Sequence, residues 1–260
     1  MNDRVTIAVA DGIADVRLNR ADKMNAIDPA MFEGIAAAID RLAGMAEVRV
    51  VVLSGEGRAF CAGLDMASMA GGGSGMLTQA RTHGIANLVQ QVAWGWRTLP
   101  QPVIAAVHGV ALGGGLQIAA GADVRIVAAD ARLSVRELHW GIVPDMAGYA
   151  LWRGCVRDDR LREAVYSARE FDGGEAVALG FATRVAADPL AEAMALAATI
   201  AGRNPDAVRA AKRLFAVAAT GDDAGVLAAE SAEQAALLGS ANQREQVAAN
   251  LEKRAARFAD

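Results

Sequence analysis

The sequence predicts an α/β fold, in which largely parallel strands alternate with helices. Three runs are almost wholly apolar and have the length of a strand that is covered on both faces, namely Val48–Leu53, Val103–Val107 and Val124–Val127. Segments of helical composition separate these runs, and strands joined through helices pair in parallel with right-handed crossovers. The last third of the chain is rich in alanine and predicts consecutive helices. We therefore expect an α/β core followed by a helical region.

The composition indicates a globular protein with neither nucleic acid nor membrane as partner. The chain of 260 residues is 53% hydrophobic and 22% charged, which allows a sizeable core. Its net charge of −4 and the lack of a basic run argue against nucleic acid or an anionic membrane surface. The opening MNDRVTIAVADG resembles neither a secretory signal nor a transmembrane helix. Cys61 and Cys155 lack CxxC spacing and the three histidines are scattered, which predicts a reduced cytoplasmic protein without a metal site.

Local signals place the first elements. Val5–Val9 and Ile13–Leu18 flank Asp11-Gly12 and predict a hairpin. Asp28-Pro29 predicts a helix start, because the aspartate can accept from free amides and proline suits the first helical position. The composition of Gly84–Thr98 predicts a further helix.

The C-terminal part carries clear helix signals. Asp172 and Glu175 form a capping pair before Ala176–Leu179, and Gly180 suits the helix end. We expect an α/β core over residues 1–188 and a helical oligomerisation region over residues 189–260. Three alanine-rich helices are predicted there, over Pro189–Gly202, Pro205–Ala219 and Asp223–Leu238. The glycine-rich stretch 71–75 predicts a flexible loop.

Three segments that follow predicted strands carry the residues suited to chemistry. They read SGEGRAFCAGLD (Ser54–Asp65), HGVALGGGLQ (His108–Gln117) and LSVRELHWGIVPD (Leu133–Asp145). In open α/β sheets, ligands bind in the crevice at the carboxyl ends of the strands. We therefore expect these segments to meet around one site.

The glycines of two segments suggest a pair of backbone donors. Gly113-Gly114-Gly115 precedes the helical run Leu116–Ala120, so an oxygen can approach the amides at the helix start without meeting a Cβ atom. A tight turn would also explain a lone glycine triplet. Gly63-Leu64 offers a second exposed amide, and two converging amides form an oxyanion hole.

These segments, in this order and spacing, resemble those of the crotonase superfamily, the enoyl-CoA hydratase/isomerase family. LNRADKMNAID near the N-terminus, FDGGEAVALGFATRV and the terminal LEKRAARF also resemble family segments. The resemblance therefore extends over essentially the whole chain. It implies a ClpP-like fold of repeated ββα units whose C-terminal helices build trimers, often paired into hexamers.

The resemblance also implies an acyl-CoA thioester as substrate and no separate cofactor. The Leu64 and Gly114 amides would hold the thioester oxygen. The CoA side of the pocket would be formed by Met24, Ala26, Ala62, Gly63 and Asp65. Lys253 matches a lysine that a neighbouring subunit presents to the CoA phosphates, although it could equally be a solvated helix end. The loop at 71–75 would border the acyl pocket.

Glu137 matches the catalytic glutamate of the family and stands among apolar neighbours, which should raise its pKa. An ion pair with Arg136 is the structural alternative. Hydratases of the family carry a second glutamate where this chain has Gln117. We expect Gln117 to contribute to substrate binding, because an amide can bind water but cannot take its proton. Asp145 has the spacing of an aspartate in dienoyl-CoA isomerases, but it could instead cap a helix over Met146–Trp152. Two further residues would line the acyl pocket or belong to the core, Trp140 and Met66.

The sequence thus favours an enoyl-CoA isomerase in which Glu137 moves a proton along an enolate and Asp145 extends its reach. Three alternatives stay open. The first is an enoyl-CoA hydratase that tolerates Gln117. The others are an acyl-CoA hydrolase and an inactive CoA-binding protein, against which the retention of Glu137 argues.

Overall fold

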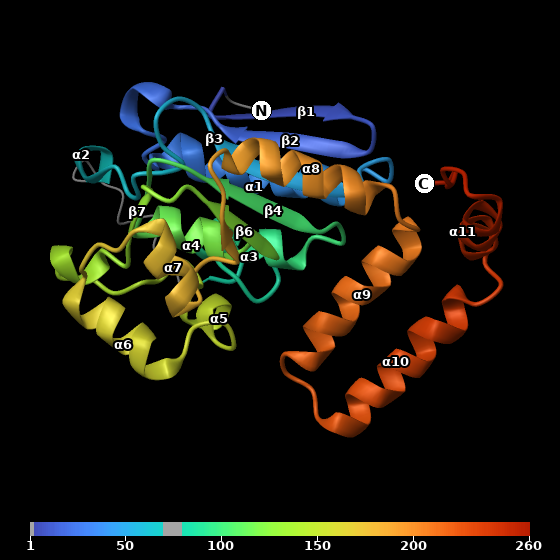
Figure 1. The fold of residues 1–260 in the computed structure, drawn as a ribbon. Coiled ribbons are helices and arrows are strands. Elements are labelled where there is room, and N and C mark those ends of the chain that lie inside the picture. The colour runs from blue at the N-terminus through green and yellow to red at the C-terminus, as the bar shows by residue number, and fades with distance from the viewer. Residues whose placement is uncertain (1–2, 70–79) are drawn as a thin grey trace.

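The computed structural model describes residues 3–69 and 80–260 of the chain. The glycine-rich stretch 71–75, expected to form a loop beside the acyl pocket, lies outside the described residues. The main sheet has six strands in the order β1-β2-β3-β4-β6-β8 (Figure 1). Only β1 and β2 are antiparallel, as expected of the hairpin, and the other neighbours are parallel. The strands are β1 (Val5–Ala10), β2 (Ile13–Leu18), β3 (Val50–Gly55), β4 (Val103–Val107), β6 (Val124–Val127) and β8 (Arg184–Val185).

A second sheet has two strands and is separate from the main sheet. It consists of β5 (Val110–Leu112) and β7 (Arg132–Ser134), which are parallel. The chain thus repeats one pattern, in which a strand of the main sheet is followed by a strand of the small sheet. The two repeats are β4–β5, which precedes helix α4 (Gly114–Ala120), and β6–β7. The ββα prediction is confirmed. The glycine triplet, however, directly follows β5 rather than β4. Strand β5 was not predicted, because a strand of three residues is too short to recognise in the sequence.

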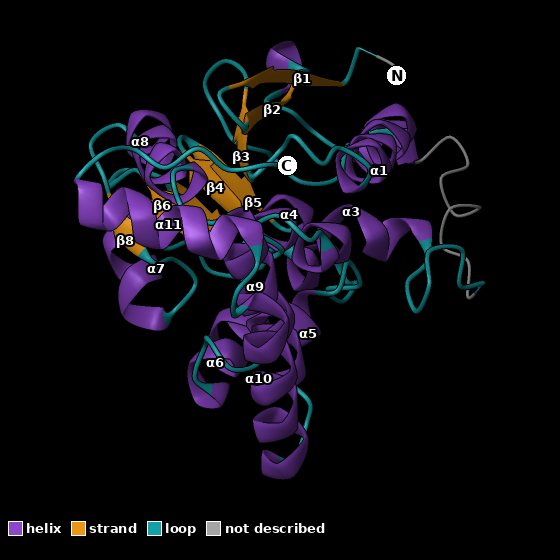
Figure 2. Cartoon of the chain, turned by 90° about the vertical axis from the view of Figure 1, so that its right-hand side faces the viewer, coloured by secondary structure: helices purple, strands orange, loops and turns teal. Residues whose placement is uncertain are grey.

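The continuous apolar strands are explained by burial of both faces of the sheet. Val50 and Val52 of β3 pack with Ile104 of β4 against helix α8 (Pro189–Ala201). Their neighbours Val51 and Leu53 face the opposite side, where helices α1 (Pro29–Ala43), α3 (Leu88–Thr98) and α4 pack. Successive side chains of a strand point to opposite faces, so both sets must be apolar. The result is a three-layer core of helix, sheet and helices (Figure 2).

Side-chain caps fix several helix starts. Asp28 accepts a hydrogen bond from Met31 N at the start of α1, as expected. Helix α3 starts at Leu88 and not at Gly84, because Asn87 and Gln90 form a reciprocal capping box there. The shorter helices are η1 (Ala21–Lys23), α2 (Met66–Met69), η3 (Glu137–Trp140), α5 (Gly148–Trp152), α6 (Asp158–Ser167) and α7 (Gly173–Leu179).

The C-terminal helices differ in how they are held. Helix α8 belongs to the core, whereas α9 (Pro205–Ala218) and α10 (Asp223–Leu237) extend away from it (Figure 1). No residue of α10 is buried. A fourth helix, α11 (Ala241–Glu252), was not predicted, although Ser240 caps its first turn.

One buried cation connects helix α9 to the core. Lys212 Nζ donates to Trp96 O at 3.2 Å, to Gln101 O at 2.8 Å and to Asp123 Oδ2 at 2.7 Å. These acceptors belong to α3 and to the segments before β4 and β6. Burial lowers the pKa of Lys212, while the Asp123 carboxylate opposes that change.

We predict that Lys212→Ala lowers the free energy of unfolding by about 2–3 kcal/mol, because two carbonyls lose their lysine donor and Asp123 keeps only Val103 N and the more distant Arg97 as partners. Arg213→Ala is the matched control on the same helix, where an exposed ion pair with Glu233 is lost at a cost below about 1 kcal/mol. Urea denaturation measures both. Equal losses in the two variants would contradict the anchoring role of Lys212.

Candidate active site

The site forms where three parallel segments end side by side. Ala111 of β5 pairs with Leu133 of β7 on one side and with Cys61 on the other. Cys61 N donates to Val110 O at 3.0 Å, and Leu112 N donates to Cys61 O at 3.1 Å. The residues that follow these segments therefore emerge at one edge of the small sheet.

Two backbone amides at this edge are available as donors. The neighbours of Leu64 are bound to Ile27, through Ile27 N to Gly63 O at 2.8 Å and Asp65 N to Ile27 O at 3.0 Å. The Leu64 amide points away from this pairing, and Gly114 is the first residue of α4. Neither amide donates a hydrogen bond within residues 3–69 and 80–260. The two loops touch, since a Cβ atom on Gly63 would lie 2.5 Å from Leu112 O and 3.7 Å from Gly114 N.

Glu137 is the buried carboxyl group of the site, with 6% of its surface exposed. Its Oε1 accepts a hydrogen bond from Gln117 Nε2 at 2.5 Å. Its Oε2 is buried and has no partner in the described part of the chain. Burial raises the pKa of Glu137, the charge of Asp145 raises it further, and the hydrogen bond from Gln117 opposes the shift. The alternative of an ion pair with Arg136 is wrong, because Arg136 pairs with Glu170.

Asp145 lies at the rim of the site and not in a helix cap. Helix α5 begins at Gly148, and its N-cap residue is Ala147. The side chain that binds the amides at this helix start is that of Gln117, whose Oε1 accepts from Met146 N and Gly148 N at 3.0 Å each. The capping alternative for Asp145 is therefore wrong. Partial burial raises the pKa of Asp145, although solvent at the exposed rim screens the effect more than at Glu137.

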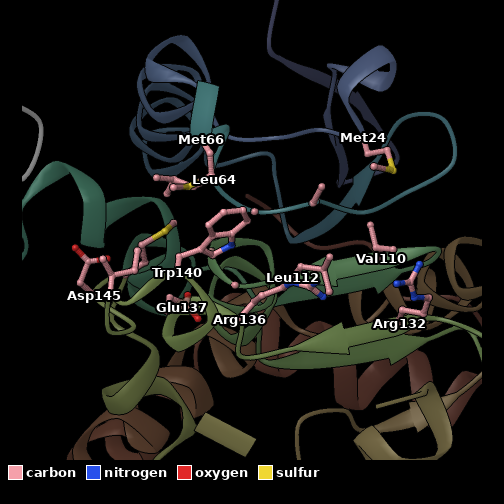
Figure 3. Close-up of a pocket in the computed structure, with 16 residues that line it drawn as sticks. Met24, Leu64, Met66, Val110, Leu112, Arg132, Arg136, Glu137, Trp140 and Asp145 are labelled. Carbon is pink, nitrogen blue, oxygen red and sulfur yellow. The ribbon is translucent and has the colours of Figure 1, made fainter. Parts of the chain in front are cut away.

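The two carboxyl groups and the two amides border one cavity of about 360 Å³. Figure 3 shows Asp145 at one end of the lining side chains and Arg132 at the other, with Trp140 and Glu137 between them. Trp140 and Met66 are exposed at the cavity, so they are not core residues. The full lining consists of Met24, Ala62, Gly63, Leu64, Met66, Val110, Leu112, Gly113, Gly114, Arg132, Arg136, Glu137, Trp140, Ile142, Asp145 and Met146.

Four residues predicted for the site do not line the cavity, namely Ala26, Asp65, Gln117 and Lys253. Asp65 forms an ion pair with Arg20 at 2.7 Å, which lowers the pKa of its carboxyl group to about 2. Gln117 is buried behind Glu137. Lys253 is exposed at the end of α11, across the molecule from α2 (Figure 1).

Sequence reasoning missed the residue that fixes the loop carrying Met24. Asn25 is fully buried with a positive φ of 55°. Its Nδ2 donates to Glu56 O and Ala59 O, and its Oδ1 accepts from Arg20 N. Asparagine tolerates the left-handed backbone conformation better than most residues. The asparagine of Met24-Asn25, which follows a 3₁₀ turn, was therefore the available sequence signal for this tight loop. The arginines of the cavity, Arg132 and Arg136, were also missed.

The structure also bears on metal binding and on membrane insertion. Within the described residues, no group of three or more His, Cys, Asp or Glu side chains is arranged to hold a metal ion. Across residues 3–69 and 80–260, no helix has both the length and the apolar character needed to cross a membrane.

Comparison with known proteins identifies the family. The model of a family described as enoyl-CoA hydratase/isomerase matches residues 8–260. A probable enoyl-CoA hydratase from Bacillus subtilis is 31% identical over 260 residues, covering 98% of each chain. The human mitochondrial Delta(3,5)-Delta(2,4)-dienoyl-CoA isomerase is 30% identical over 218 residues, covering 77% of this chain and 64% of that one.

The fold agrees with this relationship. The crystal structure of enoyl-CoA hydratase from Mycobacterium tuberculosis H37Rv matches with a TM-score of 0.87 and 28% identity over 99% of both chains. The match spans the α/β core and the C-terminal helices alike. The chain therefore has the crotonase fold and belongs to the enoyl-CoA hydratase/isomerase family.

Proposed function

We propose that the protein is an enoyl-CoA isomerase, which shifts a double bond of an enoyl- or dienoyl-CoA through an enolate. The observation that carries this proposal is the pairing at the base of the site. Glu137 has one buried oxygen without a partner among the described residues, and the residue beside it, Gln117, is an amide that cannot accept a proton. One carboxylate suffices to take a proton and return it elsewhere.

The cavity has the polarity that an acyl-CoA requires. Arg132 lies at one end, with Arg136 between it and Glu137 (Figure 3), and Glu170 neutralises only one of the two arginine charges. The other end carries the apolar side chains of Met66, Trp140 and Ile142 together with Asp145. An anionic CoA head would therefore lie toward the arginines and the acyl chain toward Trp140.

The proposed reaction follows from the groups around the cavity. Glu137 Oε2 takes a proton from the carbon next to the thioester carbonyl, and the electron pair moves onto the carbonyl oxygen. The amides of Leu64 and Gly114 stabilise that enolate oxygen, and in measured enzymes one such donor is worth roughly 3–4 kcal/mol. The enolate re-forms the carbonyl, the double bond moves, and the γ-carbon takes the proton back from Glu137. The raised pKa of Glu137 suits exchange with a weak carbon acid.

Asp145 extends the proposal to dienoyl-CoA substrates. It lines the same cavity as Glu137, eight residues further along the chain, and it has no capping role. A shift from a 3,5- to a 2,4-diene requires a proton at a more distant carbon, which a second acid can supply. The relationship to the human dienoyl-CoA isomerase supports this reading.

Hydration is the second candidate, because other relatives bear the name enoyl-CoA hydratase. Addition of water to a 2-enoyl-CoA needs a base that takes a proton from water. Gln117 cannot do so, and Glu137 would have to act alone. This favours isomerisation.

The test of the function is incubation with 2-enoyl-, 3-enoyl- and 3,5-dienoyl-CoA, followed by mass and ultraviolet analysis. We expect an unchanged mass with a new chromophore from the 3-enoyl or 3,5-dienoyl substrate. A mass gain of one water from the 2-enoyl substrate, without isomerisation, would show a hydratase instead.

Glu137→Gln should lower turnover by ~10²–10⁴-fold, because it keeps the shape of the side chain and removes its basicity.

Asp145→Asn separates the two carboxyl groups. If Asp145 serves the longer shift, turnover of 3,5-dienoyl-CoA should fall by ~10²–10⁴-fold while 3-enoyl-CoA turnover persists. The acid limb of the remaining activity should move to lower pH, because loss of the Asp145 charge lowers the pKa of Glu137, which works as a carboxylate. Parallel loss on both substrates, or an unmoved acid limb, would count against these roles.

We also propose that the C-terminal helices associate three chains. Helix α10 buries no residue, and the large side chains of Phe215 and Leu227 are exposed. Lys253 lies away from its own cavity, so it could reach CoA phosphates only at a neighbouring subunit. Light scattering should give the mass of a trimer or hexamer, whereas a monomer at micromolar concentration would remove that role of Lys253.

A further inference from the structure

Gln117 is a buried polar side chain behind the cavity that makes three hydrogen bonds. It projects from α4 with 1% of its surface exposed. Its Nε2 donates to Glu137 Oε1 at 2.5 Å, and its Oε1 accepts from Met146 N and Gly148 N at 3.0 Å each. One amide group thus bridges the candidate proton carrier and the start of α5.

The bridge fixes which end of the amide faces Glu137. Two backbone N–H groups can be satisfied only by the carbonyl oxygen of Gln117, so its NH₂ group must point to Glu137. Glu137 Oε1 is therefore always occupied as an acceptor. Oε2 is buried and has no partner within residues 3–69 and 80–260, so it is the Glu137 oxygen left to exchange a proton.

The backbone is shaped around this bridge. A Cβ atom on Gly148 would lie 2.7 Å from Gln117 Oε1 and 2.6 Å from the Trp152 ring. Any larger residue at position 148 would displace the amide from its two donors. Glycine at this helix start thus permits the close approach on which the bridge depends.

We propose that Gln117 is a positioning residue that locks Glu137 Oε1 and commits Oε2 to proton transfer. This inference rests on the proposed role of Glu137. It also gives the Asp145 segment a fixed place, since the amide of the next residue, Met146, is held by the same side chain. Gln117 itself does not line the cavity.

The charged and titratable groups around Glu137 determine how to test this. The charge of Asp145 raises the pKa of Glu137, the charge of Glu137 in turn raises the pKa of Tyr149, and the neighbouring Arg136 is paired with Glu170. A hydrogen bond donated to a carboxylate stabilises its charged form. Gln117→Met removes that donor, so the pKa of Glu137 should rise. Gln117→Glu keeps an acceptor for the α5 amides but places a second carboxyl group beside Glu137. The two groups would share one proton, which should raise the pKa of Glu137 further.

The experiment is a carbon-13 NMR titration of the full chain carrying labelled glutamate carboxyls, with Glu137→Gln assigning the Glu137 signal. We expect the Glu137 titration to move to higher pH in Gln117→Met and to become a coupled pair in Gln117→Glu. In kinetics with the active substrate, kcat should fall about 10–100-fold with little change in KM, and the acid limb should move upward. Gln101→Met is the matched control, since Gln101 is as deeply buried, donates to Leu42 O and Met45 O, and does not line the cavity.

A Glu137 titration in both Gln117 variants that coincides with that of the native protein would overturn the inference. Thermal denaturation checks folding, and the isosteric Gln117→Glu keeps the test decisive if the methionine variant does not fold. The titration needs no substrate. Should the protein process none of the three acyl-CoA substrates, the proposed function fails while the NMR result still decides whether Gln117 controls Glu137.

Discussion

The site depends on one constraint, the parallel pairing of Cys61, Ala111 and Leu133 in adjacent segments. Leu64, Gly114 and Glu137 follow these three residues by three, three and four positions. Because parallel segments advance together, offsets of three or four residues bring the following residues to the same edge. The hydrogen bonds of Cys61 to β5 and of Gly113 N to Ser134 O hold this alignment. The backbone amides thus obtain their positions from the sheet rather than from flexible side chains.

Burial and hydrogen bonding act in opposite directions on Glu137, and their balance explains the architecture behind it. Removing a carboxyl group from water raises its pKa and favours the neutral form. Gln117 returns part of the lost solvation to Oε1 alone, which leaves Oε2 without a partner. A buried acceptor without a partner is costly in a folded protein. The same amide binds the start of α5, so the Glu137 carboxyl group and the start of this helix are linked through one side chain.

Local sequence signals predicted the parts of the fold that depend on neighbouring residues. The two apolar runs that became β3 and β4 were recognisable because both faces are buried, and Asp28 and Asp172 were recognisable as caps. Strand β3 starts at Val50 rather than Val48, because the Val48 amide is used in the turn after α1. The short strand β5 and the anchor Lys212 were not foreseen, because each is defined by partners distant in the sequence.

The candidate site divides in the same way. Motif spacing identified Glu137, Leu64 and Gly114, all of which border the cavity. It predicted that Gln117 binds substrate, and it allowed Asp145 to be the cap of the following helix. In the structure, Gln117 binds the start of that helix, from 29 to 31 residues away in the sequence. No local pattern encodes such a bond. The arginines of the cavity were missed for a related reason. The sequence at the end of a strand does not show which side chains face a cavity.

The central claim is that the Leu64 and Gly114 amides stabilise a thioester enolate above Glu137. The most direct measurement is a crystal structure of the Glu137→Gln variant with an enoyl-CoA bound. The account predicts the thioester oxygen within about 2.7–3.1 Å of both amides, with residue 137 facing the α-carbon. A thioester oxygen bound elsewhere, with either amide hydrogen-bonded to water, would contradict it.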